Sequence, residues 1–213
     1  MSREQKTFFI AGLILAVSEI WKQYCLTYVL YGGAYQWSFF PFQLCSVPMY
    51  IALILGFSGT GHFRDSLLSF LADFSLMSGA IVLLDTSGMH YGYAPLTLHS
   101  YLWHFALVLL GIYAGTRERD DGRHAFGGAV AVYLVCCFVA EVINFCFDRF
   151  GIVNMFYINP HYYMVQIGFR SLLRFLPNRA VIVVYIIFTI LGASLLHLFW
   201  YHEKRRMKGR ITT

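Results

Sequence analysis

Long runs of apolar residues recur along this chain, separated by short connectors rich in glycine, proline or charged residues. Most of these runs are long enough for an α-helix to cross a hydrocarbon core of about 30 Å, which takes about 18 residues or more. The pattern predicts an all-α polytopic membrane protein, whose residues 1–213 form a single transmembrane domain with a six-helix bundle. The predicted spans are 8–30, 42–57, 66–84, 98–115, 125–147 and 180–201.

The connector at 148–179, between the fifth and sixth spans, does not fit this simple alternation. It reads DRFGIVNMFYINPHYYMVQIGFRSLLRFLPNR, which is too apolar for a free loop and too interrupted for a span. Irregular backbone is tolerated at membrane depth only where protein or a water-filled cavity surrounds it. We therefore expect this connector to fold back as a lid, either partly re-entrant or lying at the membrane interface.

Composition supports the membrane assignment and argues against a nucleic-acid partner as the reason for the positive net charge. Hydrophobic residues make up 58% of the chain and charged residues 13%, about half the charged fraction of soluble proteins. The net charge of +5 does not indicate a nucleic-acid partner, because no folded basic domain is predicted to display it.

Lys and Arg instead indicate the orientation of the chain in the membrane. Eleven of them fall at the N-terminus, after the second and fourth spans and at the C-terminus, whereas four fall in the connector 148–179. By the positive-inside rule both termini are cytoplasmic. We expect a multi-pass protein of the cell membrane, of the bacterial plasma-membrane kind, with an uncleaved first helix because SEIWKQYC replaces a cleavage site.

Cysteines and histidines give no sign of a disulfide framework or a metal centre. The five cysteines lie inside or at the edges of predicted spans, unlike the loop cysteines of secreted domains. His90, His99 and His161 lack the close spacing of typical ligand sets. We predict no metal and no cofactor.

Costly polar residues in predicted spans mark a candidate site, because each ionisable group there costs a few kcal/mol. Cys45 is expected about 6 Å inside the outer boundary, and His104 at a similar depth. Glu141 and Asn144 occupy the last two turns of the fifth span, also on the outer side. These side chains from three spans therefore share one predicted depth.

The stretch FPFQLCSVPMY around Cys45 indicates a reactive thiol. Pro41 is predicted to start the helix, whose positive end favours a thiolate, and Pro48 to kink it. His104 is then the candidate base for nucleophilic catalysis by Cys45.

Three further polar residues are assigned supporting roles around this pair. Glu141 is expected to orient His104, and Gln43 and Asn144 to donate hydrogen bonds to an oxyanion. Glu19, one turn from Lys22, is expected to form a structural pair with it and to support the site from below.

Packing roles remain alternatives for both members of the pair. A buried cysteine is usually a small hydrophobic residue, and we assign that role to Cys25, Cys136, Cys137 and Cys146. His104 is equally suited to a hydrogen bond between helices.

Four motifs carry a family resemblance over nearly the whole chain. SEIWKQ, FQLCS, LHSYLWHFALVLL and VINF followed by GIVNMFYINP occur in the order seen in YwaF-like bacterial integral membrane proteins, which are similar to eukaryotic transmembrane protein 164. The resemblance implies six spans and a Cys/His acyl-transfer pair, here Cys45 and His104, acting on phospholipids. The chain departs from these proteins at Gln43, where YwaF-like sequences have His, and at Ser46, where the eukaryotic protein has His.

The leading functional prediction is an intramembrane acyltransferase or thiol-dependent lipid hydrolase, acting on phospholipid acyl chains through an acyl-cysteine. Its expected partners are membrane phospholipids and lysophospholipids. One alternative is a small-solute or ion-coupled carrier whose path is lined by the intramembrane charges Glu19, Lys22, Asp73 and Glu141. Another is a non-catalytic protein that binds a lipid or other ligand in the same pocket.

Overall fold

The computed structural model describes residues 1–117 and 123–211, and these residues form helices and irregular segments without strands. Arg119, which entered the charge count, lies outside the described ranges. The helices are α1 (Arg3–Tyr24), continued by the π-helical η1 (Cys25–Leu30), α2 (Val47–Phe57), α3 (His62–Phe70), the π-helical η3 (Leu71–Ser75), α4 (Leu76–Leu84), α5 (Ala94–Arg117), α6 (Arg123–Phe147) and α7 (Asn178–Ile211). The predicted all-α polytopic class is confirmed, and five helical segments are long and apolar enough to cross a membrane.

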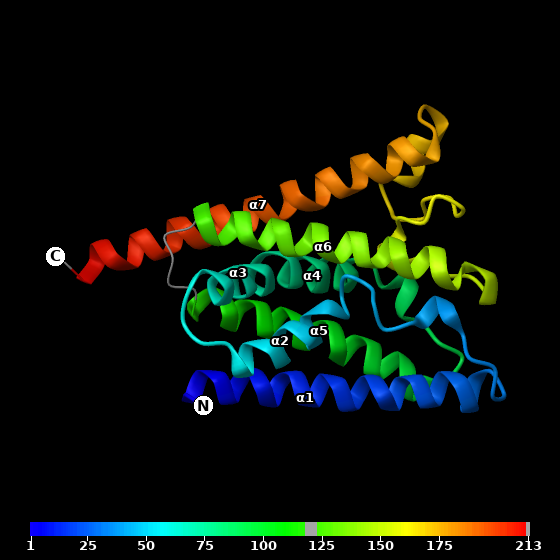
Figure 1. Ribbon diagram of the computed structural model, residues 1–213, viewed down its shortest axis with the longest axis horizontal. Coiled ribbons are helices and arrows are strands. Elements are labelled where there is room, and N and C mark those ends of the chain that lie inside the picture. The colour runs from blue at the N-terminus through cyan, green and yellow to red at the C-terminus, as the bar shows by residue number, and fades with distance from the viewer. Residues whose placement is uncertain (118–122, 212–213) are drawn as a thin grey trace.

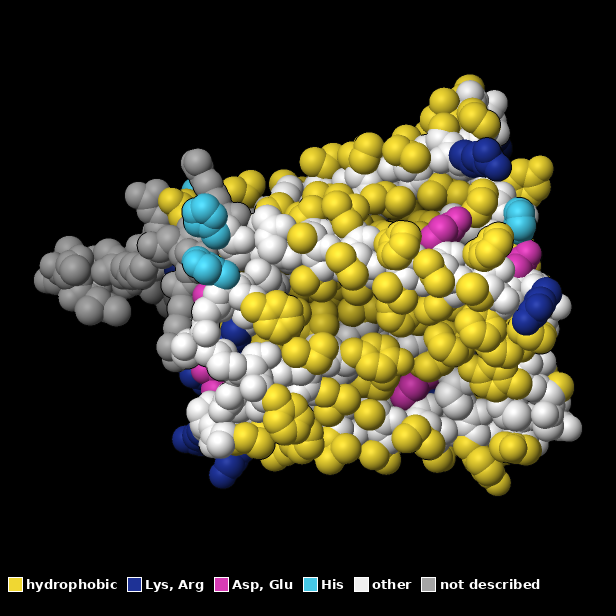
Figure 2. Space-filling view, viewed as in Figure 1, with side chains coloured by type: hydrophobic (Ala, Val, Ile, Leu, Met, Phe, Trp, Pro, Cys, Tyr) yellow, Lys and Arg dark blue, Asp and Glu magenta, His cyan; other side chains and the backbone are white. Residues whose placement is uncertain are grey.

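The helices run side by side along the long axis of the molecule, with the N-terminus and the visible end of the chain at the same end (Figure 1). Hydrophobic side chains cover the middle of the face shown in Figure 2, whereas Lys, Arg and His gather toward its two ends. Large apolar side chains such as Phe138 and Phe145 are exposed on this bundle. An apolar belt between charged ends is the surface expected of a protein surrounded by lipid.

The second helical segment is much shorter than predicted. Helix α2 has 11 residues, which gives a length of about 16 Å, roughly half of a hydrocarbon core. The predicted helix start at Pro41 and the kink at Pro48 are both wrong. Pro48 lies in the first turn of α2, where its missing N–H breaks no helical hydrogen bond.

Close packing against α1 fixes the direction of α2. A Cβ atom on Gly12 would lie 2.7 Å from the backbone nitrogen of Leu53, so only glycine permits this approach. At the far end of α2, Gln5 Nε2 donates to the Ser58 carbonyl over 2.8 Å. Helix α2 thus ends beside the start of α1, and Cys45 lies about 18 Å from that end, near the middle of the bundle.

The connector after α6 folds back onto the bundle. It contains the short 3₁₀ helices η5 (Asp148–Phe150), η6 (Met155–Tyr157) and η7 (Arg170–Arg174). Val153, Met155 and Phe156 are almost completely buried. The first half of the connector is therefore part of the core, and the chain then continues over the surface to α7.

Candidate functional site

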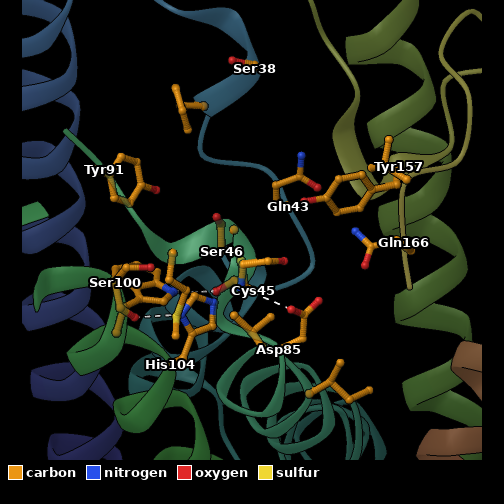
Figure 3. Close-up of a pocket in the computed structure, with 18 of the residues that line it drawn as sticks. Ser38, Gln43, Cys45, Ser46, Asp85, Tyr91, Ser100, His104, Tyr157 and Gln166 are labelled. Carbon is orange, nitrogen blue, oxygen red and sulfur yellow. Dashed lines mark hydrogen bonds between the residues drawn. The ribbon is translucent and has the colours of Figure 1, made fainter. Parts of the chain in front are cut away.

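A cavity of about 430 Å³ opens where the chain before α2, the end of α4, the first turns of α5 and the connector meet (Figure 3). Apolar side chains including Ile81, Val82, Val165 and Ile167 form part of its wall. Its polar and aromatic lining includes Lys22, Gln43, Cys45, Ser46, Asp85, Tyr91, His99, Ser100, Trp103, His104, Tyr157 and Gln166. The cavity therefore offers polar groups next to hydrocarbon surface.

Cys45 lies in the irregular chain just before α2. The turn is closed by two hydrogen bonds to the Gln43 carbonyl, from the backbone N–H groups of Ser46 (2.7 Å) and Val47 (3.2 Å). Trp103 Nε1 donates to the Cys45 carbonyl over 3.0 Å. This bond joins the cysteine turn to α5 at the residue that precedes His104.

His104 lies in the third turn of α5 and is buried, with 8% of its surface exposed. Its Nδ1 is 2.8 Å from the Ser100 carbonyl. Because a carbonyl oxygen only accepts, Nδ1 carries the proton in this bond, and the neutral ring keeps Nε2 as its acceptor. The structure thus places a potential base in the cavity that Cys45 also lines, as Figure 3 shows.

Gln43 and Asn144 hold the connector in place. The Gln43 amide donates to the Asn154 carbonyl (2.9 Å) and accepts from the Phe156 N–H (2.8 Å). The Asn144 amide accepts from the Met155 N–H (2.6 Å) and donates to the Met155 carbonyl (3.2 Å). Gln43 still lines the cavity, but Asn144 does not, so its predicted role as an oxyanion donor has no geometric support.

Glu141 is exposed and does not line the cavity. Its carboxylate accepts a 3.4 Å hydrogen bond from Asn144 Nδ2. The hydrogen bond that orients His104 comes instead from its own helix, through Ser100. Glu141 therefore does not orient His104, the role that its predicted depth in the membrane suggested.

Glu19 forms the structural pair expected from its spacing. Its carboxylate is 2.8 Å from Lys22 Nζ and accepts a 2.8 Å hydrogen bond from Gln23 Nε2. Glu19 itself is buried, whereas Lys22 lines the cavity and lies 5.8 Å from the centre of the Trp103 ring. Glu19 thus holds a cation at the cavity wall from behind.

Tyr157 and Tyr91 also line the cavity, and sequence reasoning did not select either of them. Burial raises the pKa of Tyr157, as does the neighbouring Cys45, and burial raises the pKa of Tyr91 to about 12. Both hydroxyls therefore stay protonated at neutral pH and can donate. The motif NMFYINP contained Tyr157, but nothing in it indicated the direction of that side chain.

A second buried polar cluster lies apart from this cavity. Asp73 Oδ2 is 3.0 Å from His197 Nδ1 and accepts a 2.8 Å hydrogen bond from Ser69. Neither Asp73 nor Glu141 lines the cavity. Of the charged residues that the carrier alternative invokes, Lys22 lines the cavity with Glu19 behind it, whereas Asp73 and Glu141 lie elsewhere.

Comparison of the chain with known protein families, with curated proteins and with solved structures found no match. A functional assignment therefore depends on the residues and geometry of the cavity.

Proposed function

We propose that the cavity carries out thiol-dependent acyl transfer on phospholipids within the membrane, as an acyltransferase or a lipid hydrolase. The observation that supports this most is the shared position of Cys45 and His104. Both line one cavity, the Cys45 carbonyl is bonded to the residue before His104, and His104 keeps Nε2 as an acceptor. Activation of a cysteine nucleophile requires a base in the same site, and His104 is an imidazole that shares this cavity with Cys45.

In the first half of the proposed reaction, His104 Nε2 takes the proton of the Cys45 thiol. The thiolate attacks the ester carbonyl carbon of a phospholipid, and a C–S bond forms. The ester C–O bond then breaks, and the imidazolium of His104 returns its proton to the lysolipid oxygen that leaves.

In the second half, the acyl group moves from Cys45 to an acceptor. His104 removes a proton from a lysophospholipid hydroxyl, in the transferase, or from water, in the hydrolase. The resulting oxygen nucleophile attacks the thioester, and Cys45 leaves as a thiolate that recovers its proton.

Lipid is the favoured substrate class for two reasons. The bundle exposes many apolar side chains on the face shown in Figure 2, and the cavity wall itself combines apolar and polar groups. The resemblance to YwaF-like proteins supports the same substrate class. An acyl chain and its ester fit this mixed lining better than a small polar solute does.

The test is lipid turnover in liposomes that contain a phospholipid and a lysophospholipid with distinguishable chains. We expect the wild-type protein to exchange or release acyl groups and to carry an acyl adduct on the Cys45 peptide, detected by mass spectrometry. Cys45→Ala should lose both, whereas Cys146→Ala, which changes an exposed cysteine, should keep both. Unchanged turnover by Cys45→Ala would rule out the thiol mechanism.

A further inference from the structure

Two consecutive aromatic residues in the connector adopt a backbone conformation that side chains rarely accept. Phe156 has φ 57° and Tyr157 has φ 58°, in the left-handed region. Such conformations persist in non-glycine residues only where the surrounding structure determines them, and they cluster at functional sites.

Side chains from three other places hold the backbone on both sides of Phe156. Gln43 fixes the Asn154 carbonyl and the Phe156 N–H, and Asn144 fixes both backbone groups of Met155. Asn159 Nδ2 donates to the Val153 carbonyl over 2.7 Å. These bonds replace the hydrogen bonds that regular structure would supply.

The Phe156 ring anchors the same segment. It is 1% exposed and lies between Phe42 and Tyr133, at ring-centre distances of 5.9 and 6.1 Å. With Phe156 fixed in the core, the next residue is directed to the cavity. Tyr157 enters the pocket from the connector, and His104 and Ser100 line another side (Figure 3).

The cysteine turn and Tyr157 are joined through one amide. Gln43 precedes Cys45 by two residues, and the Phe156 N–H that it accepts belongs to the residue before Tyr157. The backbone positions of nucleophile and tyrosine are thus coupled by two hydrogen bonds across more than one hundred residues of sequence. Groups that act on the same reacting atoms must be held in a fixed relative geometry, and these hydrogen bonds contribute to it.

We infer that Tyr157 contacts the substrate, and that its hydroxyl donates a hydrogen bond to the ester carbonyl oxygen while Cys45 attacks the carbonyl carbon. This inference rests on the proposed function. Negative charge develops on that oxygen as the C–S bond forms, and a fixed donor stabilises the charge in the transition state. Gln43 and Asn144 then act as positioning residues that hold Tyr157, in place of the direct donor roles expected from sequence.

Two small reagents separate this role from a structural one. Decanoic acid p-nitrophenyl ester acylates a thiolate through a tetrahedral oxyanion and releases p-nitrophenolate. Methyl methanethiosulfonate modifies the same thiolate by disulfide formation, with methanesulfinate as the leaving group, and develops no oxyanion. The adducts are assigned to Cys45 by peptide mass spectrometry, because four other cysteines are present.

Tyr157→Phe removes only the hydroxyl, and we expect it to slow acylation of Cys45 by a factor of about 10². The rate of thiosulfonate modification should stay at the wild-type value. Tyr163→Phe removes a hydroxyl from an exposed residue of the same connector, and should match the wild-type protein with both reagents. A thermal melt of each variant in detergent checks that the fold is retained.

Each other outcome contradicts the inference in a distinguishable way. Equal acylation of wild type and Tyr157→Phe overturns the role of Tyr157 and leaves the proposed function standing. An equal loss of rate with both reagents shows that the hydroxyl controls access or folding, and also overturns it. If the ester does not acylate wild-type Cys45 while the thiosulfonate modifies it, the proposed function fails together with the inference.

Discussion

His104 owes its proposed role to a hydrogen bond within its own helix. The Ser100 carbonyl, one turn earlier in α5, accepts from Nδ1 over 2.8 Å. A carbonyl has two lone pairs, so this bond is compatible with the helix. It fixes the ring orientation and the tautomer that makes Nε2 a base, without a carboxylate partner.

Replacement of His104 tests this assignment at the residue scale. His104→Gln keeps a polar side chain but cannot take a proton at neutral pH, and we expect it to slow Cys45 acylation by a factor of about 10² to 10⁴. The p-nitrophenyl ester assay measures the change. His124→Gln, at an exposed position of α6, is the control. An unchanged acylation rate in His104→Gln would remove this residue from the mechanism.

The half-length helix α2 depends on its contact with α1. Gly12 of α1 faces the backbone of α2. Gly56 of α2 faces Phe9 of α1, and a Cβ atom added to Gly56 would lie 2.7 Å from the Cβ atom of Phe9. Small residues that let two helices approach are a general means of packing within membranes, where burial of apolar surface gives no driving force. This contact sets the height of the cysteine turn in the bundle.

Two glycine substitutions of opposite expected sign test the contact. Gly12→Ala places a methyl group against the α2 backbone and should lower the free energy of unfolding by about 1–3 kcal/mol. Gly127→Ala, with nothing within 4 Å of the added carbon, should raise it by about 0.5–1 kcal/mol through helix propensity. Denaturant titration in detergent gives both values. Equal stabilities for Gly12→Ala and wild type would contradict the close packing.

The connector is a second element whose position depends on single amides. Asn144→Leu removes both hydrogen bonds to Met155 and leaves its buried N–H and carbonyl without these partners. We expect faster hydrogen exchange at residues 153–158 and slower acylation of Cys45, although Cys45 and Tyr157 are unchanged. Val142→Leu, on an exposed part of α6, should alter neither. Wild-type exchange in Asn144→Leu would show that the clamp is not needed.

The helical segments were predictable because the length and apolar character of a run determine whether it can span a membrane. The stretch before α2 misled the prediction, since Phe40 and Phe42 pack inside the protein and give the same apolar composition as lipid contact. The prediction that Cys45 and His104 share a site agrees with the cavity that both line, but the depth of Cys45 was counted from a helix start at Pro41 that the structure does not have. The rotation of each helix about its own axis could not be predicted from the sequence. The sequence therefore did not show that Glu141 faces away from the cavity.

Tyr157 illustrates what local sequence does not contain. Its backbone conformation is determined by Gln43, which lies over one hundred positions away, and by Asn144 on the preceding helix. No local propensity favours consecutive left-handed aromatic residues. Only the assembled contacts turn an apolar connector into a wall of the cavity.

At the scale of the whole molecule, both ends of the described chain lie toward one end of the bundle (Figure 1). The distribution of Lys and Arg favours the cytoplasm for this end. We expect a membrane-impermeant maleimide to label His90→Cys in intact cells, and Arg3→Cys only after permeabilisation. Both positions are exposed, and the native cysteines are replaced in this experiment. The reverse labelling pattern would invert the orientation.

The short α2 has a consequence for how a lipid would reach the thiol. A phospholipid ester normally lies at the boundary of headgroups and hydrocarbon, whereas Cys45 lies near the middle of the bundle, just before the first residue of α2. In the proposed reaction, a substrate would be drawn partly out of its leaflet, and its glycerol region would lose water on the way. Lys22, Asp85 and Gln166 lie in the cavity wall. Their polar groups would replace the lost hydrogen bonds to water, so that the polar part of the lipid stays solvated inside the cavity.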